Sequence, residues 1–254
     1  MMKIHEILDR YELLFPNDKR FEDLRRFHLD GDQHSLFRLL ESFSDSQLIT
    51  AYRKLREDTS FADDCLARGQ IQSKLWLVTE LKKLDLDLGT IFLCAGWYAT
   101  LATMLFEQDL TIKKIRSFDI DDSCWKIAET FNKPWVMKDW QFKSSTQDIH
   151  DINFSTHVYN VNRSDGSTCE LTDSPDTIIN TSCEHIADFK KWYNNIPNGK
   201  ILILQTNNYF DLDEHINCSK SVEDFSEQTA MEKTLYQGEL VLDKYSRYMK
   251  IGIK

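Results

Sequence analysis

The sequence lacks the segments that would send a chain into a membrane or out of the cell. No apolar run is long enough to cross a bilayer, because charged residues interrupt every candidate stretch. Met1 to Glu6 contain no apolar core of the kind that a signal peptide needs. The closest apolar stretch, Thr90 to Phe106, is better explained as a buried strand, a turn and a helix. We therefore expect a cytoplasmic protein without a membrane partner.

Paired cysteines are also absent. The six cysteines form no CxxC motif, and their wide spacing matches neither a zinc ribbon nor a small disulfide scaffold. They are Cys65, Cys94, Cys124, Cys169, Cys183 and Cys218. His215 and Cys218 lie three positions apart but have no further ligands at metal-binding spacing, so we predict no metal site. A reducing compartment fits this pattern best.

Positive charge is scarce. Lys and Arg number 31 against 41 Asp and Glu, which gives a formal net charge of -10. This charge repels nucleic acid phosphates, so we expect a small-molecule substrate rather than bulk nucleic acid. With 254 residues, 41% of them hydrophobic, the chain can form an α/β domain that carries a smaller helical appendage.

The first third of the chain has helical patterns and little strand signal. Apolar residues fall on one face between Ile4 and Phe15, and again between Phe21 and Phe27. Ser44 and Gln47 have the spacing of a capping box before a third helix that reaches Leu55. A fourth helix is predicted over 63–84. We interpret residues 1–85 as a helical N-terminal cap.

From residue 86 to 254, short β-rich runs alternate with helical patterns, which indicates a parallel sheet. Buried strands are predicted at 91–94, 114–120, 176–180 and 200–205, with a weaker one at 140–144. An Asp165-Gly166 turn predicts a β-hairpin insertion at about 155–172. The tail, 235–242 and 245–253, alternates as two antiparallel strands. The fold class is therefore α/β, with a mostly parallel sheet, an antiparallel C-terminal hairpin and the N-terminal cap.

This order of elements resembles class I S-adenosylmethionine (SAM)-dependent methyltransferases, which have a Rossmann-like fold. The resemblance covers about residues 88–254 and implies SAM as the cofactor. The family's Gly-rich loop corresponds to Cys94, Ala95, Gly96 and Trp97, because small residues tolerate tight, positive-φ turns there. This sequence departs from the family pattern, since Gly96 stands alone and two aromatic residues follow it. Trp97 and Tyr98 cannot both be buried, so one is expected to line the pocket, and Tyr98 is a catalytic candidate.

The acid after the second strand is a stronger match. Asp119 follows Gly96 by 23 positions and ends a predicted strand, where an acid can bind ribose hydroxyls. By resemblance, Asp119 would bind the ribose, Ile120 would lie against the adenine, and Asp121 is the alternative acid. The competing interpretation is that the residues at 121–123 only cap the following helix.

The loop after the weak strand is a further candidate. Gln147 and Asp148 stand where the family often places an acid or amide against the adenine amine. An ordinary polar loop is the alternative.

The segment 180–185 ends a strand at the sheet edge where ligands bind in open α/β folds. Asn180 and Thr181 are therefore candidates to contact the cofactor. Glu184 or His185 could serve as a general base, and a histidine in the first turn of a helix would be kept neutral by the helix dipole. In the alternative, Thr181 or Ser182 caps that helix and Glu184 complements its dipole.

Two groups outside these motifs are weaker candidates. Lys74 lies on the helix that leads into the first strand and could reach a carboxylate, although a solvated position is the other possibility. The polar and aromatic residues at 207–209 and 215–218 could recognise a substrate or form a solvated loop.

The leading hypothesis is an enzyme that transfers the SAM methyl group to a small or medium-sized acceptor. Attack at another SAM carbon, giving aminocarboxypropyl transfer, cyclisation or lysis, is an alternative that the unusual Gly96 loop motivates. A non-catalytic binding protein on the same fold is a third hypothesis. An NAD oxidoreductase is the weakest, because the G-x-G-x-x-G fingerprint is absent.

Overall fold

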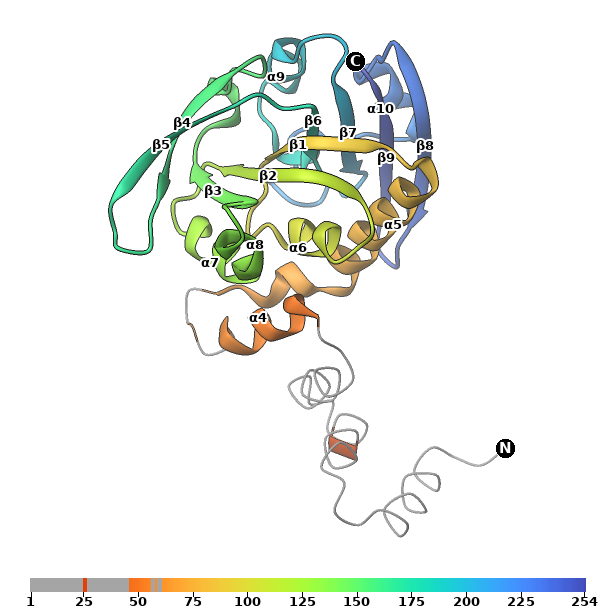
Figure 1. Ribbon diagram of the computed structural model, residues 1–254. Coiled ribbons are helices and arrows are strands. Elements are labelled where there is room, and N and C mark those ends of the chain that lie inside the picture. Colours follow the sequence, from red (N-terminus) through yellow and green to blue (C-terminus); the bar gives the residue numbers. More distant parts are fainter. Residues whose placement is uncertain (1–24, 27–45, 56–57, 59–60) are drawn as a thin grey trace. The chain divides into compact units, whose positions relative to one another are not determined.

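The computed structural model describes residues 25–26, 46–55, 58 and 61–254 (Figure 1). By its contacts the chain divides into two compact units, Met1–Asp58 and Thr59–Lys254. In the first unit, helix α4 spans Gln47–Leu55. The helices predicted at 4–15 and 21–27 lie outside the described residues except for the helical pair 25–26, and so does the capping residue Ser44. The predicted division into a cap over residues 1–85 and a SAM-binding domain over 86–254 stays a prediction.

The helix predicted over 63–84 is divided into two parts in the second unit. A 3-10 turn, η1, spans Asp63–Leu66, and helix α5 spans Arg68–Leu84. Ala67 between them has an extended ψ of 150°, which breaks the single helix expected over 63–84. Asp85 then ends α5 in the left-handed conformation, with φ of 47°.

Among the described strands, seven form one sheet in the order β3-β2-β1-β6-β7-β9-β8 (Figure 1). They are β1 (Asp87–Cys94), β2 (Thr111–Asp119), β3 (Phe142–Thr146), β6 (Thr177–Asn180), β7 (Ile201–Asn207), β8 (Lys233–Val241) and β9 (Ser246–Ile253). The five strands from β3 to β7 pair in parallel, whereas β9 pairs antiparallel with both β7 and β8. The predicted α/β fold, a mostly parallel sheet closed by an antiparallel hairpin, is confirmed.

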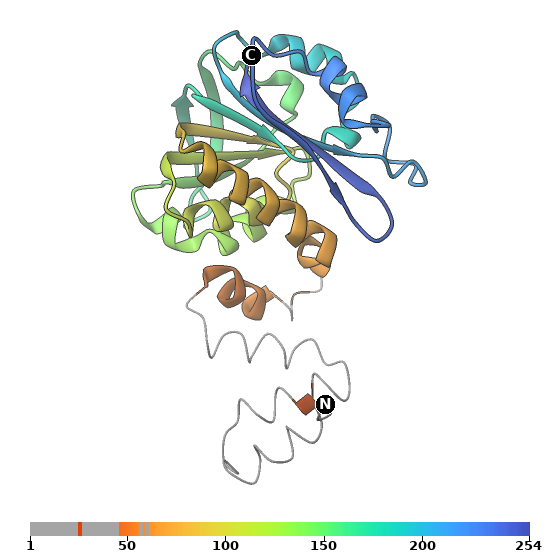
Figure 2. The same cartoon turned by 90° about the vertical axis from the view of Figure 1, so that its right-hand side faces the viewer.

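Helices cover both faces of this sheet (Figures 1 and 2). On one face lie α5, α6 (Thr100–Phe106), α7 (Cys124–Phe131) and α8 (Lys133–Met137), and on the other α9 (Phe189–Asn195) and α10 (Val222–Gln228). Because side chains alternate along a strand, Phe92 and Cys94 of β1 point to the α9 face, where they join a buried cluster around Trp192. No helix in the described part of the chain is both long and apolar enough to span a bilayer.

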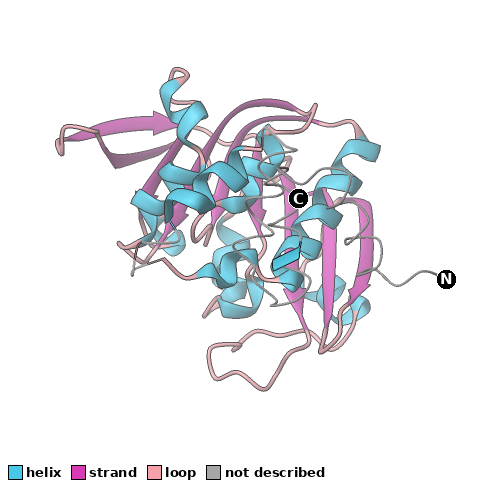
Figure 3. Ribbon diagram, turned by 90° about the horizontal axis from the view of Figure 1, so that it is seen from below, coloured by secondary structure: helices cyan, strands magenta, loops and turns pink. Residues whose placement is uncertain are grey.

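The predicted hairpin is also present. It follows a 3-10 turn, η2 (Ile149–Asp151), and its strands β4 (His157–Asn162) and β5 (Thr168–Asp173) pair with each other outside the main sheet. The hairpin projects on the left in Figures 1 and 3. At its base, the buried Asp173 carboxylate accepts hydrogen bonds from Arg116 Nε at 2.7 Å and from the Tyr159 hydroxyl at 2.6 Å. This ion pair fastens the insertion to β2.

Candidate functional site

The carboxyl ends of the five parallel strands lie at one edge of the sheet. The chain runs from β1 outward to β3 on one side, and later returns to form β6 on the other side of β1. Open α/β sheets bind ligands at such a reversal, beyond the carboxyl ends of the strands. Here those ends are Cys94, Asp119, Thr146, Asn180 and Asn207.

The loop after β1 has an unusual backbone. Ala95, Trp97 and Ala99 all have positive φ, at 50°, 47° and 49°, whereas Gly96 does not. The positive φ angles of this loop therefore fall on two small residues and one aromatic residue, and not on the glycine. Gly96 is needed for close approach instead, because a Cβ there would lie 2.2 Å from the buried Ser117 Oγ on β2. Left-handed conformations of non-glycine residues are strained, and such strain is concentrated at functional sites.

Asp119 holds this loop against the end of β2. Its Oδ2 accepts the backbone N–H of Trp97 at 2.7 Å, and its Oδ1 accepts that of Asp121 at 3.1 Å. Burial raises the pKa of the Asp119 carboxyl above its ordinary value, although these backbone hydrogen bonds oppose the rise. Beside it, the Ile120 side chain is 71% exposed. An anchored acid and an uncovered apolar side chain thus lie next to each other at the sheet edge.

Asp121 has a local structural role. Its Oδ1 accepts the Ser123 backbone N–H at 2.8 Å, and hydrogen bonds from the Ser123 side chain and backbone lower the pKa of the Asp121 carboxyl. This contact orders the turn that precedes α7, as the capping interpretation expects. These contacts are local to the turn and do not indicate that Asp121 binds a ligand.

Gln147 and Asp148 follow the end of β3, next to Asp119. The backbone N–H of Gln147 donates to the Asp119 carbonyl at 2.8 Å. Asp148 Oδ1 accepts the backbone N–H of His150 at 2.9 Å and so caps η2. Both side chains are half-buried. The structure therefore brings them close to Asp119, and their contact with a cofactor stays a prediction.

The two aromatic residues of the loop have different environments. Trp97 and Tyr98 stack with ring centroids 4.6 Å apart, but Trp97 is half-buried while Tyr98 is only 4% exposed. The Tyr98 hydroxyl accepts the Ala62 backbone N–H at 3.4 Å, and its ring lies 5.7 Å from that of Phe61. Trp97 is thus the more accessible ring, as expected if only one of them can be buried.

The two strands at the reversal, β1 and β6, both end in buried side chains. Cys94 lies in the core beneath α9, and burial raises the pKa of its thiol. Asn180 is fully buried, and its Oδ1 accepts the Ser182 backbone N–H at 2.8 Å. Its Nδ2 has no hydrogen-bond partner within the described residues. At this edge of the sheet, a buried amide donor is therefore left unsatisfied by the described part of the chain.

Glu184 forms a buried ion pair that the sequence did not reveal. Its Oε1 accepts from Arg247 at 2.6 Å and from Asn207 Nδ2 at 2.7 Å, and the Glu184 and Arg247 side chains are 3% and 4% exposed. Arg247 also donates to the Thr181 carbonyl at 3.1 Å. The other carboxylate oxygen, Glu184 Oε2, is buried without a partner in the described part of the chain.

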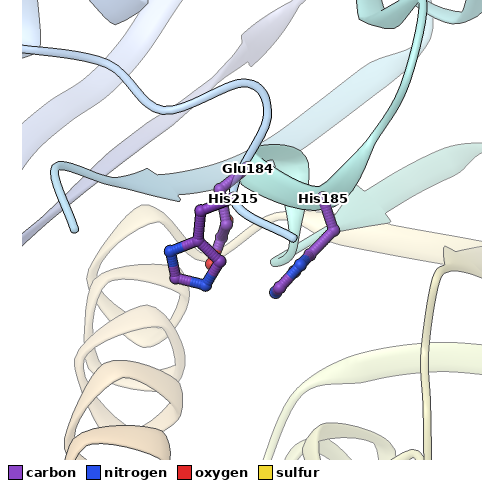
Figure 4. A group of neighbouring side chains, drawn as sticks. All are labelled: Glu184, His185 and His215. Atoms are coloured by element: carbon purple, nitrogen blue, oxygen red, sulfur yellow. The ribbon is translucent and has the colours of Figure 1, made fainter. Parts of the chain in front are cut away.

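His185 lies in a 3-10 turn rather than in the first turn of a helix. This turn, η3, spans Cys183–His185, and α9 begins only at Phe189. The expectation that a helix dipole keeps His185 neutral was therefore wrong, because η3 is too short to form one. The exposed His185 ring lies 4.6 Å from the ring of His215, and Glu184 reaches the same place (Figure 4).

Lys74 is buried, so its expected solvated alternative was wrong. The side chain lies on the first turns of α5, and its Nζ donates to Gln70 Oε1 at 2.6 Å. Burial, together with the nearby charge of Arg247, lowers the pKa of Lys74 to about 7. The neighbouring Ser73 contacts Arg247 and Gln205, which places this end of α5 at the carboxyl edge of the sheet.

Solved structures of several methyltransferases share this fold. The N-methyltransferase NodS from Bradyrhizobium japonicum WM9, in complex with S-adenosyl-L-homocysteine, aligns with a TM-score of 0.53 at 12% identity, over 83% of this chain and 99% of that one. Magnesium protoporphyrin IX methyltransferase (ChlM) from Synechocystis PCC 6803, with bound SAM, gives 0.51 at 14% identity, over 86% and 96%. Geranyl diphosphate methyltransferase, in complex with GPP and sinefungin, gives 0.50 at 9% identity, over 72% and 77%.

Sequence comparisons add nothing to this, since no protein-family model and no curated protein matches the chain. At 9–14% identity the alignments establish the arrangement of strands and helices, and not a substrate. The chain has the Rossmann-like fold of class I SAM-dependent methyltransferases.

Proposed function

We propose that this protein is an enzyme that uses SAM to methylate a small or medium-sized acceptor. The observation that carries the proposal is the arrangement at the strand reversal. There Asp119 anchors the strained loop after β1, and on the neighbouring strand β6 the buried Asn180 Nδ2 has no partner among the residues that the structure describes. Structures of this fold solved with SAM, S-adenosylhomocysteine or sinefungin support the choice of cofactor.

The residues at this edge fit the chemical groups of SAM. A ribose diol needs acceptors, which Asp119 can provide through the lone pairs that its two backbone hydrogen bonds leave open. An adenine ring needs an apolar surface, and the exposed Ile120 adjoins that acid. Gln147, whose backbone N–H donates to the Asp119 carbonyl, and the adjacent Asp148 would contact the adenine amine. Asn180 Nδ2 and the backbone of 94–97 would complete the site.

SAM, when bound, supplies a methyl group on a sulfonium that is already electrophilic. The chain's own residues therefore have mainly to position the reactants and exclude water. Trp97 offers a half-buried aromatic ring, whose face attracts cations. If the acceptor carries a proton, the His185 ring nitrogen that does not face the Glu214 carbonyl can accept it. Glu184 is held in its ion pair with Arg247, and only its Oε2 remains to act as a base.

Calorimetric titration with SAM and with S-adenosylhomocysteine tests the proposal. We expect binding by the full chain that weakens by about 10- to 100-fold in Asp119→Asn, because a hydrogen bond to a charged group contributes about 1.5–3 kcal/mol. The matched control is Asp109→Asn, which removes an exposed carboxylate just before the opposite end of β2. Absence of binding, or equal losses in both variants, would contradict the proposal.

The products of turnover distinguish the alternatives. Methyl transfer leaves S-adenosylhomocysteine, whereas attack at the aminocarboxypropyl carbon leaves methylthioadenosine, and mass spectrometry separates the two. Binding of SAM without turnover of any offered acceptor would favour the non-catalytic alternative.

A further inference from the structure

Two histidines and a buried carboxylate converge beyond the carboxyl edge of the sheet (Figure 4). Glu184 and His185 come from η3, and His215 comes from the loop after β7, thirty residues further along the chain. One possible ligand atom from each residue lies within 4.8 Å of those of the other two. From this convergence we propose that Glu184, His185 and His215 bind a divalent transition-metal ion.

The backbone prepares both imidazoles for this role. His185 Nδ1 lies 3.1 Å from the Glu214 carbonyl oxygen, and His215 Nδ1 lies 2.6 Å from that of Tyr209. A carbonyl oxygen can only accept, so each Nδ1 carries a proton, and in a neutral imidazole the lone pair is then on Nε2. Metal-binding histidines characteristically donate their second ring nitrogen to a carbonyl or carboxylate in this way.

The carboxylate is prepared in the same manner. Glu184 Oε1 is occupied by Arg247 and Asn207, which fix the group, while the buried Oε2 has no partner among the described residues. A buried carboxylate oxygen without a hydrogen bond costs free energy, and a cation would satisfy it. Cys218, which the sequence analysis considered beside His215, donates to Asn207 Oδ1 instead and stays out of the cluster.

The ligand set indicates the class of ion. Two imidazoles and one carboxylate suit first-row transition ions such as Zn²⁺, Co²⁺ or Fe²⁺, rather than Mg²⁺ or Ca²⁺, which prefer oxygen. Ligands bonded at about 2.0–2.2 Å lie about 3–4 Å apart, so the three ligand atoms, which lie within 4.8 Å of one another, would draw closer together when an ion binds. Three protein ligands leave coordination positions open to solvent.

An acceptor molecule could bind the ion at an open coordination position. A bound ion lowers the pKa of a coordinated hydroxyl or water and fixes its orientation. An acceptor whose hydroxyl oxygen binds the ion would release its proton to solvent and present the aligned oxygen to the methyl donor. In the metal-bound protein this role would replace proton acceptance by His185, because the ion occupies the same ring nitrogen. The role rests on the proposed methyl transfer, whereas binding of the ion does not.

Titration of the metal-free full chain with Co²⁺, followed by visible absorption and by competition with Zn²⁺, tests the site without SAM. We expect one equivalent to bind and Zn²⁺ to displace it. His185→Ala and His215→Ala should each raise the Co²⁺ dissociation constant by at least about 10-fold, because loss of an outer-shell contact alone costs about 10- to 100-fold. The control is His150→Ala, since His150 also faces a backbone carbonyl, 2.9 Å away, but lies outside the cluster.

Lack of saturable binding, or unchanged affinity in both histidine variants, would overturn the proposal. Thermal unfolding of the metal-free variants shows whether they remain folded. Because His185 is exposed and His215 is half-buried, His185→Ala should disturb the fold less. Asp119→Asn should weaken SAM binding and leave Co²⁺ binding unchanged. Failure of the metal site is thereby distinguished from failure of the proposed cofactor site.

Discussion

Replacement of Gly96 tests whether the loop after β1 really lies against β2. A Cβ at this position would lie 2.2 Å from Ser117 Oγ, and the next nearest atom, Leu93 Cγ, would be 3.1 Å away. Overpacking of a buried contact costs about 1–3 kcal/mol, so Gly96→Ala should lower the free energy of unfolding by that amount. Ser117 could relieve the contact only by rotating its hydroxyl within a fully buried site.

A double-mutant cycle identifies the contact responsible. Ser117 Oγ has no hydrogen-bond partner within the described residues, so Ser117→Ala should be neutral or stabilising by itself. The double variant should be about 1–2 kcal/mol more stable than the sum of the single effects, because the 2.2 Å contact disappears and only the tighter approach to Leu93 remains. Urea unfolding followed by tryptophan fluorescence measures all four free energies.

Gly166 provides the control for this cycle. It has a φ of 83° in the hairpin turn, and a Cβ there would meet nothing within 4 Å. Gly166→Ala should therefore cost stability through backbone strain alone, and its effect should add to that of Ser117→Ala. A neutral Gly96→Ala, or additivity in the Gly96 cycle, would refute the close approach of the loop to β2.

Three further predictions follow from buried charges and backbone strain. Lys74 has a pKa of about 7 when folded against an ordinary 10.5, so the unfolded chain binds more protons between these values. The free energy of unfolding should rise by about 2 kcal/mol from pH 7 to 9 in wild type, and Lys74→Met should remove that rise in urea titrations. For Asp173, burial raises the carboxyl pKa, but hydrogen bonds from Lys114, Tyr159 and Arg116 outweigh it and leave a lowered value. Its stabilisation should be present above the ordinary aspartate pKa and be lost as the pH falls below it. Asp173→Asn should cost about 3–5 kcal/mol at neutral pH and flatten the acid limb of a pH series of unfolding curves, because Arg116 would lose its buried partner. Ala95→Gly should cost at least about 1 kcal/mol less than Ala102→Gly in thermal melts, since it relieves a left-handed residue instead of weakening helix α6; equal costs would contradict the strain at Ala95.

The parallel core of the sheet was predictable because its strands are short, continuous apolar runs. Strands such as β6, buried at every position, have no other common explanation between two turns. The edge strand β3 was predicted two residues too early, at 140–144 rather than 142–146. Asp139 and Trp140 have φ of 49° and 51°, a conformation that excludes them from a strand and that their side chains do not reveal.

Some short helices and the distant contacts were not predicted from sequence patterns. Helix α8 has only five residues, too few for a 3.6-residue repeat to stand out, and the seven-residue α10 has one buried residue, Phe225, and so no apolar stripe. Arg247 reaches Glu184 because antiparallel pairing places it opposite Asn207, and nothing local marks that register. His215 lies in a loop without periodicity, so only the fold shows that it faces His185.

In the part of the chain that the structure describes, buried polar atoms without hydrogen-bond partners mark the carboxyl edge of the sheet, where the sequence has no complete binding motif. Folded proteins pair nearly all buried polar groups, so an exception calls for an explanation. Among the described residues the exceptions lie in several parts of the fold, but three of them, Asn180 Nδ2, Glu184 Oε2 and Arg247 Nε, come from the carboxyl edge of the sheet. Strained residues of the β1 loop lie at the same edge. Unsatisfied groups and backbone strain both cost stability, and the cofactor and the ion that we propose would offset this cost by completing the hydrogen bonds and coordination of these groups.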